Sequence, residues 1–173
     1  MARTRNWMKI SVQKLNFPLS SEFDCKSIDL AQANLLGQLM DSSYQGTIDY
    51  EGETLEQCVQ EMKDTINGKY GAFIQEASFV VYSQNQPVSA ILITEWKGQP
   101  LVAYTMTDKN FQGKGLAKYI LGKSISALTA TSWNELFLVV TEGNLSAEKL
   151  YEKVGFKKAG QALPGTPPPA ENI

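Results

Sequence analysis

Three segments rich in valine, isoleucine and aromatic residues follow one another within residues 78–107. They are separated only by the links 84–87 and 97–100, whose length is typical of hairpins. A long amphipathic helix from Gln112 and an unbroken apolar run at 135–141 come next. Because a helix that connects two strands usually makes them parallel, the order predicts a mixed, mostly antiparallel sheet flanked by helices, of the α/β (α+β) class.

Two further helices are predicted before these strands. The first follows a cap at Asp29, and the second follows a cap at Thr54. In the first helix Ala31, Leu35 and Leu39 recur at every fourth position, so these residues are expected to form its apolar face. A loop connects the two helices.

The two ends of the chain are expected to differ in character. A first strand is predicted around 7–15, a last helix at 146–154 and a short final strand at 156–159. We expect one domain over 1–160, because 173 residues, 43% of them hydrophobic, provide one sizeable core. The proline-rich tail 161–173 is expected to be mobile or extended.

Composition excludes several classes of function. Charge is nearly balanced, with 16 basic and 18 acidic residues and no block of like charges, so neither nucleic acid nor an anionic membrane surface is predicted as a partner. No apolar run suits a signal peptide or a membrane span, which favours a cytoplasmic protein. Histidine is absent, so histidine-dependent triads and metal sites are excluded. Cys25 and Cys58 are interpreted as core thiols, and no metal is predicted.

A glycine-containing turn lies between the third strand and the long helix. Amides at a helix N-terminus bind anions, and glycine allows a bulky phosphate to approach the backbone. The spacing matches neither the Rossmann pattern of dinucleotide sites nor the Walker pattern of nucleotide sites. The ligand that fits best is therefore a diphosphate of another kind. The glycines alone fit a tight turn without a ligand equally well. The turn consists of Gln112, Gly113, Lys114, Gly115, Leu116 and Ala117.

A second motif follows one strand later, where Asn144 precedes the helix end 150–156, LYEKVGF. The segment 112–117 resembles the Q/R-x-x-G-x-G/A acetyl-CoA motif of the GCN5-related N-acetyltransferases (GNAT), and the second segment is similar to this family's Asn and L-Y-x-x-x-G-F signature. The resemblance implies a sheet whose fourth and fifth strands splay apart to admit acetyl-CoA (coenzyme A). It also implies that residues 112–117 hold the pyrophosphate.

The resemblance further implies roles for single residues. Backbone groups of Thr105, Met106 and Thr107 would pair with the pantetheine arm, and Asn144 would bond to it. Tyr151 would protonate the departing thiolate, since a phenol with a pKa near 10 is protonated at pH 7. Read without the family, Tyr151 is a core residue of its helix and Asn144 is a helix cap.

The base and the acceptor are less constrained. An amine must lose a proton before it attacks, and the strand-end carboxylates Glu95 and Glu142 are the candidates, although each also fits an ordinary surface charge. The loop between the first two helices is expected to contact the substrate, a primary amine of a small molecule or peptide. The loop residues proposed for this role are Tyr44, Asp49, Tyr50 and Glu51.

Other interpretations stay open at this point. A catalytically silent acyl-CoA sensor would share the fold, and a nucleotide-binding α/β domain would share the glycine turn. Little sequence remains after Phe156 to complete the sheet, so the sheet is short or a second subunit completes it, and a homodimer is a possible partner arrangement.

Overall fold

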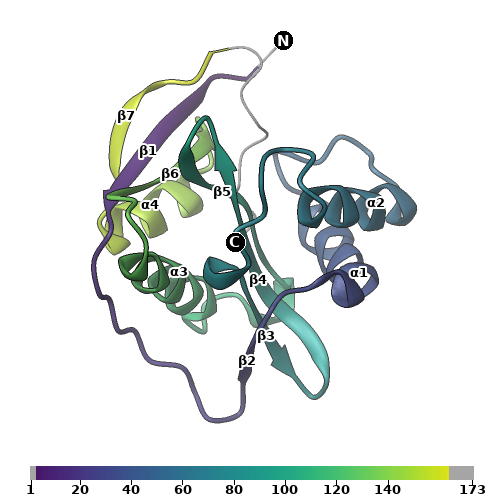
Figure 1. The fold of residues 1–173 in the computed structure, drawn as a ribbon. Helices are drawn as coiled ribbons and strands as arrows, with labels where there is room; N and C mark the ends of the chain where they lie inside the picture. Colours follow the sequence, from purple (N-terminus) through teal and green to yellow (C-terminus); the bar gives the residue numbers. More distant parts are fainter. Residues whose placement is uncertain (1–2, 164–173) are drawn as a thin grey trace.

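One mixed sheet forms the centre of the computed structural model, which describes residues 3–163 (Figure 1). Its strands are β1 (Arg5–Ser11), β2 (Asp24–Ser27), β3 (Phe79–Ser83), β4 (Gln86–Trp96), β5 (Gln99–Thr107), β6 (Glu135–Thr141) and β7 (Lys157–Gln161). Their order across the sheet is β2-β3-β4-β5-β6-β1-β7. Only β5 and β6 are parallel neighbours, and every other neighbouring pair is antiparallel. The predicted fold class is confirmed.

The three consecutive strands are joined by tight two-residue turns. Gln84 and Asn85 connect β3 to β4, and Lys97 and Gly98 connect β4 to β5, all with positive φ. Positive φ at both central positions gives the turn whose twist matches that of a hairpin. The four-residue links expected from the sequence were therefore too long by two residues each, because their last two residues already belong to the next strand.

Helices cover both faces of the sheet. The helices α1 (Ala33–Tyr44) and α2 (Leu55–Ile66) pack on one face, and α3 (Leu116–Ala127) and α4 (Leu145–Val154) pack on the other (Figure 1). Successive strand residues point to opposite faces, so Leu92 joins the core beneath α1 and α2, whereas Ile91 and Ile93 join the core beneath α3 and α4. The sheet thus separates two apolar cores.

The apolar face predicted for α1 is confirmed at Leu39 but differs at the other two positions. Ala31 is exposed and Leu35 only half-buried, whereas Leu36, Leu39 and Met40 are buried. Ala31 lies in a short 3-10 turn, Leu30–Gln32, which Asp29 caps before the α-helix begins. Within α1 the buried face is formed by Leu36, Leu39 and Met40, which are spaced at i, i+3 and i+4.

The N-terminal strand completes the sheet. β1 lies between β6 and β7 (Figure 1) and is antiparallel to both. Its residues Met8 and Ile10 lie in the core beneath α3 and α4. The final strand exists and extends to Gln161, where it pairs with β1 and forms the edge of the sheet. The strand β2 was not predicted, because DCKS shows no apolar alternation. Residues 164–173 of the predicted tail lie outside the described residues.

The parallel pair is splayed. β5 and β6 share a single register pair, Leu101 with Phe137, near the start of each strand. Beyond this pair the two strands separate toward Thr107 and Thr141, and we call the resulting gap the split. These strands are the fourth and fifth of the predicted strands, because the unpredicted β2 shifts the numbering by one. A bulge at Ala103 interrupts the pairing of β4 with β5 beside the split.

Candidate active site

The glycine turn faces open space at the end of β5. Gly113 and Gly115 have φ of 78° and 79°, and a Cβ added at either position would meet nothing within 4 Å. Gly115 is the N-cap of α3, and no side chain caps this helix. The first amides of α3 are therefore open to an anion, which fits a pyrophosphate. The helix begins at Leu116 rather than at Gln112 as predicted, because Gly115 is in the left-handed conformation.

The side chains of this turn are divided between solvent and core. Gln112 and Lys114 are exposed, and the Lys114 ammonium lies 5.8 Å from the centre of the Phe111 ring. Leu116 is buried and Ala117 half-buried, so they anchor the start of α3. Lys114 can add a positive charge beside the open amides.

The segment of β5 that borders the split is deeply buried. Thr105 and Met106 are fully buried, and Thr107 is nearly so. The Thr105 hydroxyl finds no hydrogen-bond partner among the described residues, whereas the Thr107 and Ser89 hydroxyls lie 3.0 Å apart. A single register pair to β6 leaves this edge of β5 without a strand partner farther along, which suits a ligand amide arm lying in the split.

The two residues of the second motif lie on α4, which follows β6. Asn144 is the N-cap, and its side-chain oxygen accepts a hydrogen bond of 3.3 Å from the Ala147 amide. Tyr151 is fully buried in the core beneath α3 and α4, with its ring centre 5.7 Å from that of Phe156. Asn144 is therefore a helix cap and Tyr151 a core residue, as expected without the family resemblance. A role of either residue in catalysis or cofactor binding stays a proposal.

The two candidate bases lie at opposite ends of the split. Glu142 is exposed directly after β6, at the open end, and its backbone amide donates to the Thr4 carbonyl at 2.8 Å. Glu95 pairs with Pro100 beside the closed end. By strand alternation the half-buried Glu95 shares the face of Ile93, which is the face that α3 and α4 cover.

The loop between α1 and α2 is tied to both strands of the split. The Thr141 hydroxyl at the end of β6 donates to Asp49 at 2.9 Å, and the Lys109 ammonium just after β5 donates to the Gln45 carbonyl. Tyr50 and Glu51 are exposed on this loop, whereas Tyr44 is buried in the core beneath α1 and α2. Asp49, one of the four residues predicted to contact substrate, is thus bonded to a strand of the split.

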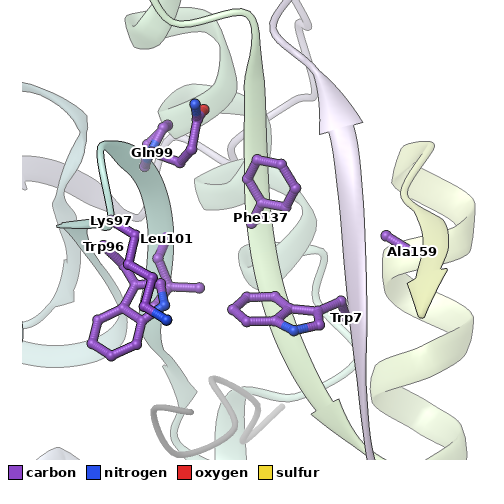
Figure 2. Close-up of a pocket in the computed structure, with 8 residues that line it drawn as sticks. Trp7, Trp96, Lys97, Gln99, Leu101, Phe137 and Ala159 are labelled. Carbon is purple, nitrogen blue, oxygen red and sulfur yellow. The ribbon is translucent and has the colours of Figure 1, made fainter. Parts of the chain in front are cut away.

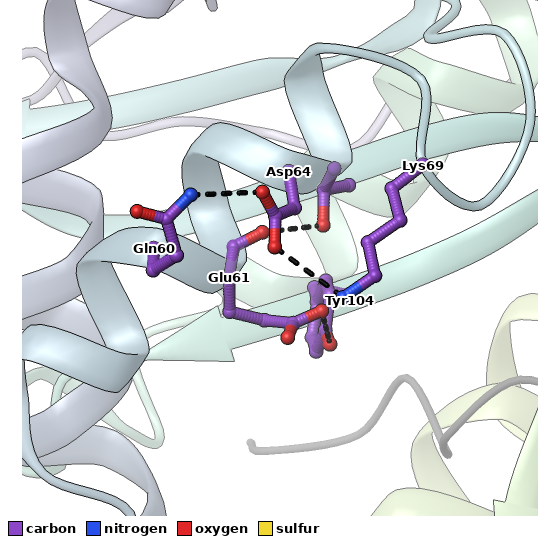
Figure 3. A network of polar contacts seen from close by, with 6 residues as sticks. Gln60, Glu61, Asp64, Lys69 and Tyr104 are labelled. Atoms are coloured by element: carbon purple, nitrogen blue, oxygen red, sulfur yellow. Dashed lines mark hydrogen bonds and ion pairs between the residues drawn. The ribbon is translucent and has the colours of Figure 1, made fainter.

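A polar network that the sequence did not reveal joins α2 to the bulge of β5 (Figure 3). The Tyr104 hydroxyl donates to the Glu61 carboxylate at 2.9 Å. Burial first, and then Tyr44 and Glu61, raise the pKa of Tyr104, and burial and Glu61 raise the pKa of Tyr70. On α2 itself Glu61 has polar neighbours, and no local pattern signals that a helix carboxylate and a strand tyrosine will meet.

We expect Tyr104→Phe to destabilise the fold by about 1–3 kcal/mol, because Glu61 loses a hydrogen bond from a buried donor. The raised pKa of Tyr104 adds a pH dependence. As the pH rises, the unfolded chain releases the Tyr104 proton near pH 10, before the folded chain does. The contribution of Tyr104 to the free energy of unfolding is therefore fully present below about pH 10 and decreases above it. Urea titrations from pH 8 to 11 should show a shallower decline for the variant.

Tyr82→Phe is the matched control, since the half-buried Tyr82 hydroxyl has Gln32 rather than Glu61 as its hydrogen-bond partner. An alkaline decline that is as steep in Tyr104→Phe as in the unmodified chain would contradict the assignment.

Both cysteines are free thiols, and Cys58 is the one that lies fully in a core. Cys58 is buried, and burial raises its pKa to about 11; Cys25 is half-buried, and burial raises its pKa as well. The described part of the chain contains no group of three or more side chains suited to hold a metal ion. Among residues 3–163, no helix is long and apolar enough to cross a membrane.

An open helix N-terminus beside a splayed parallel strand pair is the architecture of an acyl-CoA N-acyltransferase fold. Residues 39–163 match the family model described as "Acetyltransferase (GNAT) domain". The match covers most of the chain, so the chain belongs to the GNAT acetyltransferase family.

Similar proteins agree with this assignment. N-acetylaspartate synthetase of Danio rerio is 34% identical over 71 residues, which are 38% of this chain and 25% of that protein. This chain therefore matches only a quarter of that relative's length. A GCN5-related N-acetyltransferase of Sphaerobacter thermophilus has a TM-score of 0.72 at 13% identity, over 92% of this chain and 49% of that one.

A third similar structure is that of AAC(6')-Iy in complex with the bisubstrate analog CoA-S-monomethyl-acetylneamine. It has a TM-score of 0.62 at 12% identity, over 83% of this chain and 96% of that one. At these identities the two solved structures establish the fold.

Proposed function

We propose that this chain transfers an acetyl group from acetyl-CoA to a primary amine of a small molecule or peptide. The observation that carries the proposal is the arrangement of the split: the uncapped start of α3 lies at its open end, and the buried edge of β5 lies along it. The family assignment supports acetyl transfer, and the similar structure solved with a CoA analog supports CoA as the ligand.

The residues of the turn fit the donor. The amides of residues 113–117 would hold the pyrophosphate, with Lys114 adding charge and Gln112, Leu116 and Ala117 shaping the turn. The backbone of Thr105, Met106 and Thr107 would bind the pantetheine amides, and Asn144 would add a side-chain contact. Acetyl-CoA supplies the acetyl group as an activated thioester.

The chemistry requires two proton transfers. The acceptor nitrogen forms the amide bond while the carbon–sulfur bond breaks, so the nitrogen must lose a proton and the departing thiolate must gain one. We assign the donated proton to the Tyr151 hydroxyl. Both carboxylates stay candidates for the base: Glu142 is exposed at the open end of the split, and Glu95 is half-buried beside its closed end.

The test is a thiol-release assay with acetyl-CoA over a panel of amines, with mass spectrometry of the products. We expect release that depends on both acetyl-CoA and an amine, with a product heavier by one acetyl group. Binding of acetyl-CoA without release for any amine would instead support the catalytically silent sensor. The cytoplasmic location and the homodimer stay predictions from the sequence.

A further inference from the structure

An apolar pocket of about 280 Å³ lies at the closed end of the split (Figure 2). Leu101 and Phe137, the single register pair of β5 and β6, contribute to its lining. Trp7 of β1 and Trp96 at the end of β4 add two indole rings, and Lys97 of the hairpin turn adds a cation. The pocket volume lies just below the range of whole-ligand sites, so it suits a single side chain.

The pocket opens on the face of the sheet opposite α3 and α4. Trp7 and Phe137 lie edge to face, with ring centres 6.3 Å apart. Figure 2 shows these two side chains next to each other on neighbouring strands. Their strand neighbours Met8 and Leu136 point the other way, into the core beneath α3 and α4. A molecule in the pocket therefore approaches the closed end of the split from the side opposite to the glycine turn.

The wall formed by the hairpin turn is held in place. The indole N–H of Trp133, just before β6, donates to the Gly98 carbonyl at 2.9 Å, so the tip of the β4–β5 hairpin is fixed to the neighbouring strand. The Lys97 ammonium lies 5.4 Å from the centre of the Trp96 ring. Lys97 makes no salt bridge with another described residue, so an exposed cation remains available at the rim.

We propose that this pocket selects an α-amino acid with a large apolar or aromatic side chain as the acceptor. The side chain fills the space between Trp7, Trp96 and Phe137, and the carboxylate pairs with Lys97. The α-amino group is then directed toward the split. This inference rests on the proposed acetyl transfer and names the class of amine that the transfer uses.

The test compares L-phenylalanine with L-aspartate and with phenethylamine, which lacks the carboxylate, in the thiol-release assay. We expect kcat/KM for phenylalanine to exceed both others by about tenfold or more, because each poor substrate lacks one contact. Lys97→Gln should raise KM for phenylalanine by about tenfold and leave phenethylamine unchanged. Lys26→Gln is the control, since Lys26 also lies over an aromatic ring, that of Tyr82, on the far edge strand β2.

A binding measurement separates this inference from the proposed function. Phenylalanine bound beside Trp7 and Trp96 should change the tryptophan fluorescence without acetyl-CoA, and Phe137→Ala should weaken this binding by about tenfold or more. Circular dichroism reports whether that variant is folded. If it is not, the affinity of Lys97→Gln for phenylalanine, measured in the same way, tests the pocket instead. Turnover of other amines with no phenylalanine binding, or equal use of aspartate, overturns the inference. Phenylalanine binding without turnover of any amine overturns the proposed function instead.

Discussion

Tyr151→Phe is expected to lower kcat for acetyl transfer by on the order of 10²- to 10⁴-fold while acetyl-CoA affinity stays nearly unchanged. The phenol is the proposed donor of the proton that the departing thiolate gains, and phenylalanine has no proton to give. The ring would keep its buried place against Phe156, so the fold and the split should be retained. Steady-state thiol release gives kcat, and calorimetric titration gives the affinity.

Two controls separate this effect from general damage. Tyr82→Phe removes a half-buried hydroxyl on β3 that faces the core beneath α1 and α2 rather than the core that holds Tyr151, and it should leave kcat unchanged. The urea midpoint of Tyr151→Phe should show that the variant is folded under the assay conditions. An unchanged kcat in folded Tyr151→Phe would show that the proposed acid is wrong.

Gly115→Val is expected to weaken acetyl-CoA binding by on the order of 100-fold, or about 2.7 kcal/mol. Two effects act together. A β-branched residue is strained at φ of 79°, so the start of α3 shifts. A side chain also fills the open space in front of the first amides, where the pyrophosphate would lie.

Gly98→Val is the matched control, because Gly98 has φ of 80° and the same open surroundings but lies in the β4–β5 hairpin turn. It carries the same backbone strain without reaching the start of α3. Equal losses of acetyl-CoA affinity in the two variants would show that strain alone, rather than the position of Gly115, determines the effect.

Local patterns predicted the elements that depend on neighbouring residues. The capping box of Thr54 and Gln57 forms as expected at the start of α2. Leu116, Ile120 and Ser124 are all buried on one face of α3, as their spacing predicts. These features depend on contacts within one or two turns, so the sequence alone is sufficient to predict them.

Long-range pairing could not be predicted in the same way. β1 joins β6 across more than a hundred residues, and nothing in the segment RNWMKIS names its partner. The split between β5 and β6 was expected only through the family resemblance, because no periodicity distinguishes a splayed strand pair from a paired one. Likewise, the bond between Thr141 and Asp49 depends on where a loop without periodicity crosses the sheet.

The candidate site also contains features that the sequence predicts and features that it does not. The glycine turn and the second motif could be found because their residues are adjacent in sequence. The pocket could not, since Trp7, Trp96 and Phe137 come from three strands that only the folded sheet brings together. An isolated tryptophan in a strand pattern is most simply interpreted as a core residue.

Calorimetric titration of the unmodified chain with coenzyme A and, separately, with ATP tests the central claim most directly. Both ligands carry phosphates that the start of α3 can bind, but only coenzyme A has the amide-containing arm that suits the edge of β5. We expect coenzyme A to bind more tightly than ATP. Binding of ATP as tightly as or more tightly than coenzyme A would contradict the account and indicate a nucleotide site.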